Sequence, residues 1–409
     1  MLWRMKFIRK SVALIAAVIG AIAVSIGSGV SAKADAIKLG APIPITGPYS
    51  SDGLVMQHAL ELSVAEQNEK GGLLGRPIEM IVFDIGDLTP DKLQAAGTNL
   101  VDKEGVDVLI NGYGGMGPDI PAFCPYAQPY IHNDATSNVV PLMADCPNIF
   151  MGADVDVNYG RIVFEQMTAM GYEFPSKTMA IVEGPYDWEF GNTGGAKAAA
   201  EAAGWEIVAY EKVEYGISEW GAILTKLREA NPSLIFLEVL DPVAVNTFVD
   251  QFNTDPAKGS LLYVGYTGSV PAFSEVVERG IAEGVLGMTL SAQIPGDEAG
   301  DAFVARWREA YNEDPPFSIA AQIYDEFAHW VAAVNQVGAV DDYLAIADAL
   351  RSITLEGVTG TIKFNEQQFV YSSDETVPTH LLQVQGGKVV QIMIGSKKYA
   401  DFVRPSWLE

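Results

Sequence analysis

Basic side chains are scarce in this chain of 409 residues. Lysine and arginine together number 26, against 52 aspartate and glutamate residues, which gives a formal net charge of −26. Such a surface repels nucleic acid and anionic lipid, and it steers cationic ligands over a screening length of roughly 8 Å at physiological salt. The composition therefore argues against nucleic acid as a partner. A generally solvated acidic surface is the alternative to one that steers a cation.

Cysteine and histidine are rarer still. The two cysteines, Cys124 and Cys146, predict one disulfide in an oxidising compartment, which closes a loop worth ~3 kcal/mol on the chain-entropy model. Two free, buried thiols are the alternative. The four histidines include no pair at ligand spacing, so we expect no metal site.

The signatures of several enzyme classes are also missing. The chain has no G-x-S-x-G elbow, no H-E-x-x-H and no P-loop lysine after a glycine-rich turn. We therefore expect no catalytic residues and no cofactor. A hydrolase would need a nucleophile and a base together in one cleft.

The first 34 residues have the pattern of an export signal. Four basic residues precede an apolar run from Ser11 to Val30, and Ala32-Lys33-Ala34 offers a cleavage site after Ala32 or Ala34. No cysteine lies near that site, so a lipoprotein is not expected. Removing residues 1–34 would leave 21 basic against 52 acidic residues, a formal charge of −31. We expect a soluble periplasmic protein; an uncleaved membrane anchor is the alternative.

Beyond this segment, short apolar runs alternate with helix-length segments, the pattern of β-α units in parallel sheets. One series of strands is predicted at 37–45, 78–84, 106–111 and 129–133, and a second at 178–183, 207–212, 234–240 and 261–265. Helices are predicted at 53–70, 191–203, 219–230, 243–253, 297–313, 318–337 and 339–351. A hairpin is predicted at 380–385 and 389–394, turning at Gly386-Gly387. Two open α/β sheets predict two lobes that face one cleft.

Several motifs in this order resemble a known family. They are Thr46-Gly47-Pro48-Tyr49, the run from Asn68 to Pro77 (NEKGGLLGRP), Asp134-Ala135-Thr136, Phe190-Gly191 and Tyr324-Asp325. Across residues 36–395 the chain resembles the type I periplasmic solute-binding proteins, in the branch of the leucine/isoleucine/valine-binding proteins and the amide and urea receptors.

The resemblance implies two α/β lobes, each an open, mostly parallel sheet flanked by helices. Three crossings would join them near 151–154, 286–291 and 359–365. Residues 35–153 with 288–361 would form lobe 1, and residues 154–287 with 362–409 lobe 2. A hinge motion would close the lobes around a small ligand. A monomer would then deliver the ligand to the permease of an ABC transporter in the inner membrane.

Ligands of open α/β sheets bind beyond the carboxyl ends of the strands, which selects the candidate loops. The first carries Tyr49 and Asp52; ordinary turn and capping chemistry is the alternative. The second, 111–117, carries Tyr113, Gly115 and Met116, and its backbone N–H groups are suited to a carboxylate or carbonyl. Tight-turn geometry alone is the alternative there.

The third loop carries Asp134, Ala135 and Thr136, and it aligns with a family segment that binds ligand through a backbone carbonyl and a threonine hydroxyl. Asp134 stands where relatives commonly have a small apolar residue. An added carboxylate indicates a donor or cation on the ligand, unless Asp134 caps the following turn.

The fourth segment holds Trp188 and Phe190, and Phe190 aligns with an aromatic residue that covers the site in relatives. An aromatic wall for the ligand is expected, whereas Trp220 is expected in the core. The fifth candidate, Glu238, is a lone charge in an apolar strand. It faces the cleft or pairs with an internal lysine or arginine.

One departure from the family pattern bears on the ligand. In the amino-acid receptors an acidic residue holds the α-ammonium group after the 261–265 strand, and Thr267 stands in that place here. Ile319 replaces a common cleft tyrosine, and Gln322 offers an amide one turn later. Either Asp134 or Glu238 therefore holds the ammonium group, or the ligand has none.

These residues predict a receptor for a small polar ligand with a nitrogen donor, such as an amino acid, an amide or an amine. An aromatic carboxylate is the alternative ligand, because Tyr49, Tyr113 and Trp188 would stack against it. A sensor subunit that reports to a signalling partner is the alternative role.

Overall fold

The computed structural model describes residues 35–408. The predicted export signal, residues 1–34, lies outside the described residues. Within residues 35–408, no helix combines the length and apolar character that crossing a bilayer requires. The described chain contains two main sheets, each built from its own set of strands.

The first sheet has five parallel strands in the order β2-β1-β3-β4-β5. These strands are β1 (Ile37–Ile43), β2 (Ile78–Asp84), β3 (Val108–Ile110), β4 (Tyr130–His132) and β5 (Ile149–Met151). The helices between them are α1 (Ser50–Glu69), α2 (Pro90–Gly97), the π-helix η1 (Thr98–Lys103), α3 (Asp119–Phe123) and α4 (Val139–Met143). Three later helices are α10 (Glu298–Tyr311), α11 (Ala320–Val337) and α12 (Tyr343–Ser352).

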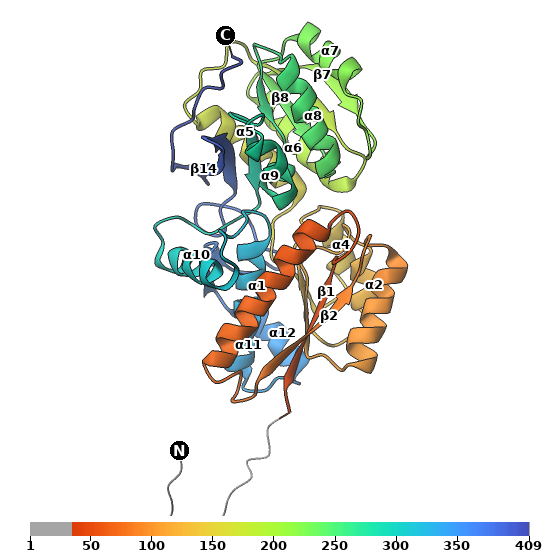
Figure 1. Cartoon of the computed structure of the whole chain (residues 1–409). Helices are drawn as coiled ribbons and strands as arrows, with labels where there is room; N and C mark the ends of the chain where they lie inside the picture. The colour runs from red at the N-terminus through yellow and green to blue at the C-terminus, as the bar shows by residue number, and fades with distance from the viewer. Residues whose placement is uncertain (1–34, 409) are drawn as a thin grey trace, which may run out of the picture. The chain divides into compact units, whose positions relative to one another are not determined.

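Side chains of this sheet alternate between two helical layers, as the period of two along a strand requires. Ile37, Leu39 and Ala41 of β1 share a core cluster with residues of α1, α11 and α12. Leu109 of β3 and Tyr130 of β4 belong instead to a cluster with residues of α2, η1, α3 and α4. The helices therefore cover both faces of the sheet, and α1 lies beside α11 (Figure 1).

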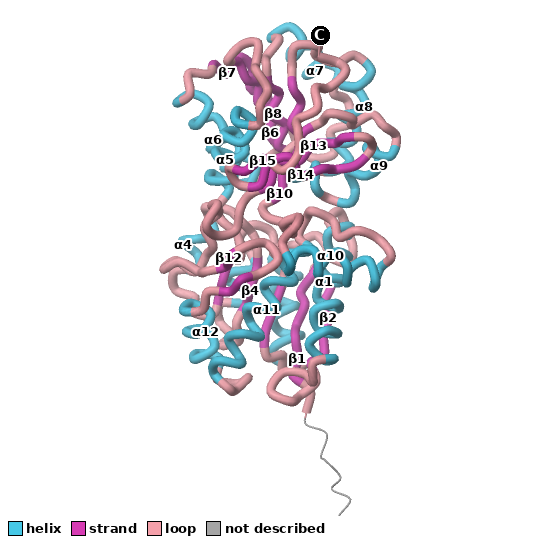
Figure 2. Tube along the Cα trace, turned by 90° about the vertical axis from the view of Figure 1, so that its left-hand side faces the viewer, coloured by secondary structure: helices cyan, strands magenta, loops and turns pink. Residues whose placement is uncertain are grey.

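The second sheet has eight strands in the order β15-β14-β13-β10-β9-β8-β6-β7. Its parallel strands are β6 (Thr178–Glu183), β7 (Glu206–Lys212), β8 (Leu234–Glu238), β9 (Leu261–Tyr263) and β10 (Leu286–Thr289). The antiparallel strands are β13 (His380–Gln385), β14 (Lys388–Ile394) and β15 (Lys397–Lys398). Figure 2 shows strands β13 and β14 on the side of β10, with which β13 pairs.

Helical segments accompany the second sheet as well. They are α5 (Asp156–Ala169), α6 (Asp187–Ala202), α7 (Gly221–Ala230), α8 (Pro242–Thr254), α9 (Ser274–Glu278) and the 3-10 turns η2 (Tyr266–Ser269) and η3 (Pro271–Phe273). A separate pair, β11 (Leu355–Glu356) and β12 (Thr361–Ile362), forms its own small sheet. The predicted α/β class with mostly parallel sheets is confirmed.

Two short strands differ from the prediction. Ile149–Met151 and Leu286–Thr289 adjoin or fall within segments expected as crossings, but they are the strands β5 and β10. The chain passes between the two sheets after β5, after β10 and between β12 and β13. The last passage lies later than predicted, because Phe369 still pairs with Met151 of β5. The division into lobes stays a prediction.

The predicted cysteine pair is bonded. The Sγ atoms of Cys124 and Cys146 lie 2.04 Å apart, and their Cα atoms lie 5.2 Å apart. The bond ties the end of α3 to the turn that precedes β5. Trp220, which we expected in the core, is fully buried there and packs edge-on against Phe248.

Candidate functional site

A cavity of about 260 Å³ lies beyond the carboxyl ends of the strands of both sheets. Its wall comes from the loops after β1, β2, β3, β4, β6, β8, β9 and β10, and from the residue before α11. This is where the topology of parallel sheets places ligands. The lining residues are Pro48, Tyr49, Ser51, Asp52, Asp87, Leu88, Tyr113, Gly115, Met116, Asn133, Asp134, Ala135, Tyr186, Asp187, Trp188, Leu240, Pro242, Tyr266, Thr267, Val270, Leu290 and Ile319.

Most of the predicted ligand-binding residues line this cavity. Nine of the thirteen do so: Tyr49, Asp52, Tyr113, Gly115, Met116, Asp134, Ala135, Trp188 and Thr267. Two of the nine, Met116 and Ala135, have positive φ angles of 63° and 57°. L-residues rarely adopt this conformation, and such strain gathers at functional sites.

One predicted residue, Phe190, turns away from the cavity. The side chain of Phe190 is 40% exposed, and the Lys212 ammonium lies 4.6 Å from the centre of its ring. The helix α6 begins at Asp187, four residues earlier than predicted, so Trp188 and Phe190 point in different directions from its first turn. The expected covering role of Phe190 has no support in this arrangement.

Two further predicted residues are buried elsewhere. Gln322 donates to Ser291 Oγ at 3.0 Å and lines a separate cavity of about 10 Å³ with Glu326 and His329. Thr136 is fully buried, and its hydroxyl has no hydrogen-bond partner. Neither side chain lies on the wall of the large cavity.

Asp52 lies in the first turn of α1, at the wall of the cavity. The helix can start there because Gly53 has no Cβ, which would lie 1.8 Å from the carbonyl oxygen of Pro44. The Asp52 side chain is 4% exposed; it accepts a hydrogen bond from Tyr113 Oη at 3.1 Å and another from Ser318 Oγ at 3.2 Å. Burial raises the pKa of Asp52 to about 6, against the lowering effect of the two hydroxyls.

Aromatic rings form much of the remaining wall. Tyr49 and Tyr113 meet edge to face with their ring centres 6.1 Å apart. On the side of the second sheet, Trp188 and Tyr266 meet in the same way at 6.4 Å. The two perpendicular pairs come from different sheets and line the same cavity.

Glu238 lies behind Trp188 and does not line the cavity. Its Oε1 accepts from the indole N–H of Trp188 at 3.0 Å and from the backbone N–H of Tyr266 at 3.4 Å. Burial raises the pKa of Glu238 to about 8, and nearby Glu189 adds to this rise. The expected alternative, an internal pair with lysine or arginine, is wrong, because the strongest partner is an indole.

Glu189 is a second carboxyl group behind the aromatic wall. It accepts from Tyr215 Oη at 2.6 Å and from the backbone N–H of Leu240 at 3.2 Å. Burial raises its pKa to about 7. Glu238 and Glu189 therefore place two weakly acidic, buried carboxyl groups behind Trp188.

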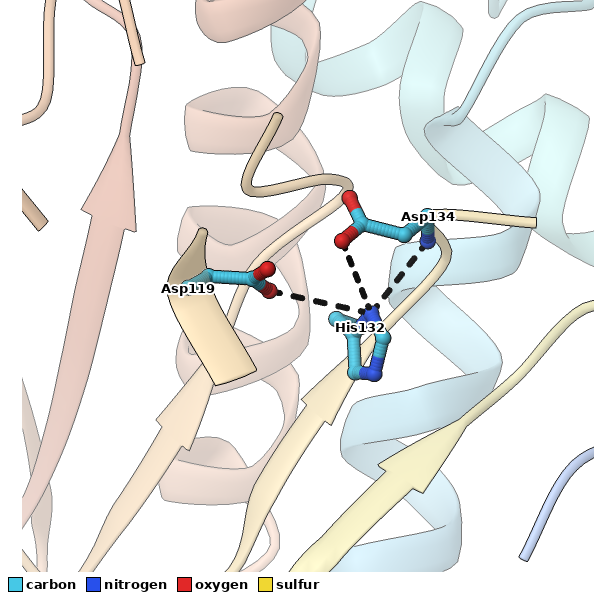
Figure 3. A group of neighbouring side chains, drawn as sticks. All are labelled: Asp119, His132 and Asp134. Atoms are coloured by element: carbon cyan, nitrogen blue, oxygen red, sulfur yellow. Dashed lines mark hydrogen bonds and ion pairs between the residues drawn. The ribbon is translucent and has the colours of Figure 1, made fainter. Parts of the chain in front are cut away.

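Asp134 belongs to a buried cluster with Asp119 and His132 (Figure 3). One oxygen of Asp134 accepts from the backbone N–H of Gly114 at 2.7 Å, and the other lies 3.8 Å from His132 Nδ1. The expected alternative, capping of the following turn, is wrong, because the amide it accepts from lies 20 residues earlier. Close packing leaves room only for glycine at 114, since a Cβ there would lie 2.4 Å from Asp119.

This cluster is the group of described residues whose ligand atoms are close enough to hold a metal ion, all within 4.8 Å of one another. Protein groups already engage it: Tyr130 Oη donates to Asp119 at 2.6 Å, and the backbone N–H of Asp134 donates to His132 Nδ1 at 3.3 Å. Burial and the neighbouring Asp134 raise the pKa of Asp119 well above its usual range, while burial lowers that of His132 to about 4. A neutral histidine and a protonated Asp119 fit these contacts.

Sequence reasoning missed several lining residues. Asp87 and Leu88 follow β2, Leu240 and Pro242 follow β8, and Leu290 follows β10. The rule that ligands bind beyond strand ends would have selected the first four, because β2 and β8 were predicted. Leu290 had no such signal, because β10 was not recognised as a strand.

Comparison with known proteins agrees with this architecture. Residues 36–384 match the family model described as periplasmic binding protein. The chain is 23% identical over 359 residues to the leucine-, isoleucine-, valine-, threonine- and alanine-binding protein of Pseudomonas aeruginosa, covering 87% of this chain and 93% of that one.

Two solved structures share the fold. A protein of Silicibacter pomeroyi assigned to branched-chain amino acid ABC transport superposes with a TM-score of 0.82 at 25% identity, covering 91% of this chain and 100% of that one. The isoleucine complex of a branched-chain amino acid substrate-binding protein from Streptococcus pneumoniae superposes with a TM-score of 0.76 at 21% identity, covering 88% and 99%. With its two parallel sheets and the cavity at their strand ends, the chain belongs to the periplasmic binding protein family, whose members bind solutes and are not enzymes.

Proposed function

We propose that this protein captures a small polar ligand with a nitrogen donor, an amino acid, an amide or an amine, and delivers it to the permease of an ABC importer. The observation that carries the proposal is the cavity at the strand ends, with the buried carboxylate of Asp52 on its wall. A carboxylate at such a place accepts hydrogen bonds from N–H groups and attracts positive charge. The Pseudomonas aeruginosa relative is named for five amino acids, which supports a ligand of this size and class.

The proposed mechanism is closure of two lobes around the ligand, by a monomer in the periplasm. One contact already joins the two sets of loops at the cavity. Asn138, after β4, donates to Asp187 at the start of α6 at 2.8 Å. This bond is exposed to solvent, so opening the cleft would exchange it for bonds to water at small cost.

An aromatic carboxylate is the second candidate ligand. The aromatic residues on the wall favour it, because stacked rings gain from burial and from edge-to-face contact. Against it stand the carboxyl groups of the same wall, which repel an anion.

A calorimetric panel tests the proposal. Residues 35–409 would be titrated with leucine, isobutyramide, butylammonium and benzoate, and the unfolding temperature would be followed in parallel. A ligand at 100 times its dissociation constant adds about 2.7 kcal/mol of stability, which is readily measured. Binding of any of the first three supports the proposed class. Binding of benzoate alone would move the function to uptake of aromatic acids.

A further inference from the structure

If this cavity is the receptor site proposed above, the charge of its wall indicates which of the proposed ligands it favours. Its 22 lining residues include no lysine, arginine or histidine. They include four aspartates: Asp52, Asp87, Asp134 and Asp187. A ligand carboxylate would therefore meet several negative charges on this wall and no counter-ion.

Asp52 is the one of the four whose carboxylate is buried yet held only by neutral hydroxyls. Its partners are Tyr113 and Ser318. Asp134 is equally buried, but its charge faces the cluster with Asp119 and His132 (Figure 3). A desolvated carboxylate gains more from a cation than from two hydroxyl groups, because charge stabilises its ionised form most strongly. Asp52 is thus the carboxylate of the wall that would gain most from a cationic ligand.

Three side-chain donors of the wall are already used by the protein. The hydroxyl of Tyr113 donates to Asp52, the indole N–H of Trp188 to Glu238, and the hydroxyl of Thr267 to the carbonyl oxygen of Val239. These side chains therefore offer the ligand ring and methyl surface rather than donors.

In the glycine loop after β3, a backbone donor is likewise already engaged by the protein. The backbone N–H of Gly114 donates to the carboxylate of Asp134 at 2.7 Å. A backbone amide of this kind would otherwise suit the carboxylate of a ligand. At this position the backbone N–H already donates to a carboxylate of the protein, that of Asp134.

The aromatic rings supply the remaining contact for a cation. Tyr49 with Tyr113, and Trp188 with Tyr266, form two perpendicular pairs on the same wall. The face of an aromatic ring carries negative potential and attracts alkylammonium groups within about 6 Å, and quaternary ammonium ligands are recognised by groups of such rings.

We propose that the ligand is an organic cation, a protonated or quaternary alkylamine that needs no carboxylate, with its charged head against Asp52 and the rings of Tyr49, Tyr113 and Trp188. This rests on the receptor function proposed above and selects the amine from its three classes. An amino acid is disfavoured because its α-carboxylate would lie against a wall with four aspartates and no basic side chain, where the donors of Tyr113, Trp188 and Thr267 are engaged.

The first test compares two molecules of the same shape. Choline and 3,3-dimethyl-1-butanol differ in one atom, a positively charged nitrogen in place of a neutral carbon. Titration calorimetry of residues 35–409 should show choline binding at least tenfold more tightly than the alcohol. Butylammonium should likewise bind at least tenfold more tightly than leucine, isobutyramide or benzoate.

Two sets of variants locate the contact. Asp52→Asn keeps a group that can bond Tyr113 and Ser318 but removes the charge, and should weaken choline at least tenfold while leaving 3,3-dimethyl-1-butanol unchanged. Asp91→Asn removes one exposed charge at the start of α2 and should leave both affinities unchanged. Tyr49→Phe should retain choline affinity, because the ring remains, whereas Tyr49→Leu should lose threefold or more.

The possible results distinguish a failure of the proposed cation from a failure of the proposed receptor function. One outcome is that leucine, isobutyramide or benzoate binds more tightly than both cations and that Asp52→Asn has no effect. This result would contradict the proposed organic cation but would still support a solute receptor. A folded protein, verified by circular dichroism, that binds none of the probes would overturn both.

Discussion

Two acidic regions lie close together at the carboxyl ends of the strands of the first sheet, and they differ in the groups that bind their carboxyl oxygens. In the cluster of Asp119, His132 and Asp134, one oxygen of each carboxyl group accepts a hydrogen bond from the protein, from Tyr130 at Asp119 and from the backbone of Gly114 at Asp134. Asp52, on the cavity wall, has two hydroxyls and no charged partner among the causes that set its pKa. Burial alone therefore does not mark a carboxylate as a ligand-binding group; what matters is whether the fold already supplies its partners.

Glu238 extends this comparison, and changing it should have the largest effect. Its pKa of about 8 exceeds the ordinary value of 4.5, so the folded protein holds a proton that the unfolded chain loses. The free energy of unfolding of the wild type should therefore fall as the pH rises from about 4.5 to 8. Glu238→Gln can still accept from Trp188 and should remove the part of that fall that Glu238 causes, so at pH 8.5 the variant should be more stable than wild type by up to roughly 5 kcal/mol, at about 1.4 kcal/mol per pKa unit.

Urea unfolding at pH 4.5 and pH 8.5 measures this effect. Glu206→Gln, at an exposed position of β7, is the matched control and should change neither midpoint. Equal stability of Glu238→Gln and wild type at pH 8.5 would show that Glu238 ionises in the fold without penalty.

Asp52→Asn should separate stability from binding. The raised pKa of about 6 means that ionised Asp52 destabilises the unliganded fold above that pH, whereas below 3.8 both states are protonated and the residue has no effect. The asparagine variant should therefore be more stable than wild type by roughly 2 to 3 kcal/mol at pH 8, while binding choline more weakly. Thermal unfolding with and without choline measures both. A variant that loses stability at pH 8 would show that the charge of Asp52 has a structural partner.

The affinity for a cation should depend on pH in the same window. A bound cation favours the ionised form of Asp52, so protonation through the pKa of about 6 opposes binding. Choline affinity should fall about tenfold from pH 7.5 to pH 5, and Asp52→Asn should remove most of this change. Any pH dependence of choline affinity that persists in the variant would come from Glu189 and Glu238. These two carboxyl groups have pKa values of about 7 and 8. Calorimetry at four pH values between 5 and 8 measures the slope.

Asp119→Asn should have the smallest effect. Asparagine keeps an acceptor for Tyr130 and gains a donor toward Asp134, which imitates a protonated Asp119, so stability should change by less than about 1 kcal/mol. Asp119→Ala leaves both neighbours without this partner and should cost about 2 to 3 kcal/mol. A cost for asparagine as large as that for alanine would show that Asp119 is ionised, as a metal ligand would be. Urea unfolding with and without a chelator distinguishes the two cases.

The sequence predicted the architecture better than the site. Alternating apolar runs and glycine-marked turns are local signals, so both parallel sheets and the final hairpin were found. The segments Ile149–Met151 and Leu286–Thr289 were not recognised as strands, because the resemblance implied crossings between the lobes near 151–154 and 286–291.

Within the site, the loops were predictable but the directions of side chains were not. Trp188 and Phe190 lie two positions apart, and only the start of α6 at Asp187 decides which one faces the cavity. Asp134 and Glu238 stood out in sequence as unexpected charges, whereas the structure binds both to protein donors. Asp52, for which ordinary turn and capping chemistry was the alternative, is the buried carboxylate of the wall that is held only by hydroxyl groups.

The cavity wall is built from loop residues and helix starts, but part of it also belongs to the cores beneath. Leu88, Ala135, Trp188, Tyr266, Val270 and Leu290 are members of one core cluster, and Ile319 is a member of another. A change of one of these residues toward a new ligand therefore also changes the packing that holds the sheets. The exposed aspartates of the wall, Asp87 and Asp187, belong to no core cluster, so laboratory redesign toward new ligands can begin there at little cost in folding stability.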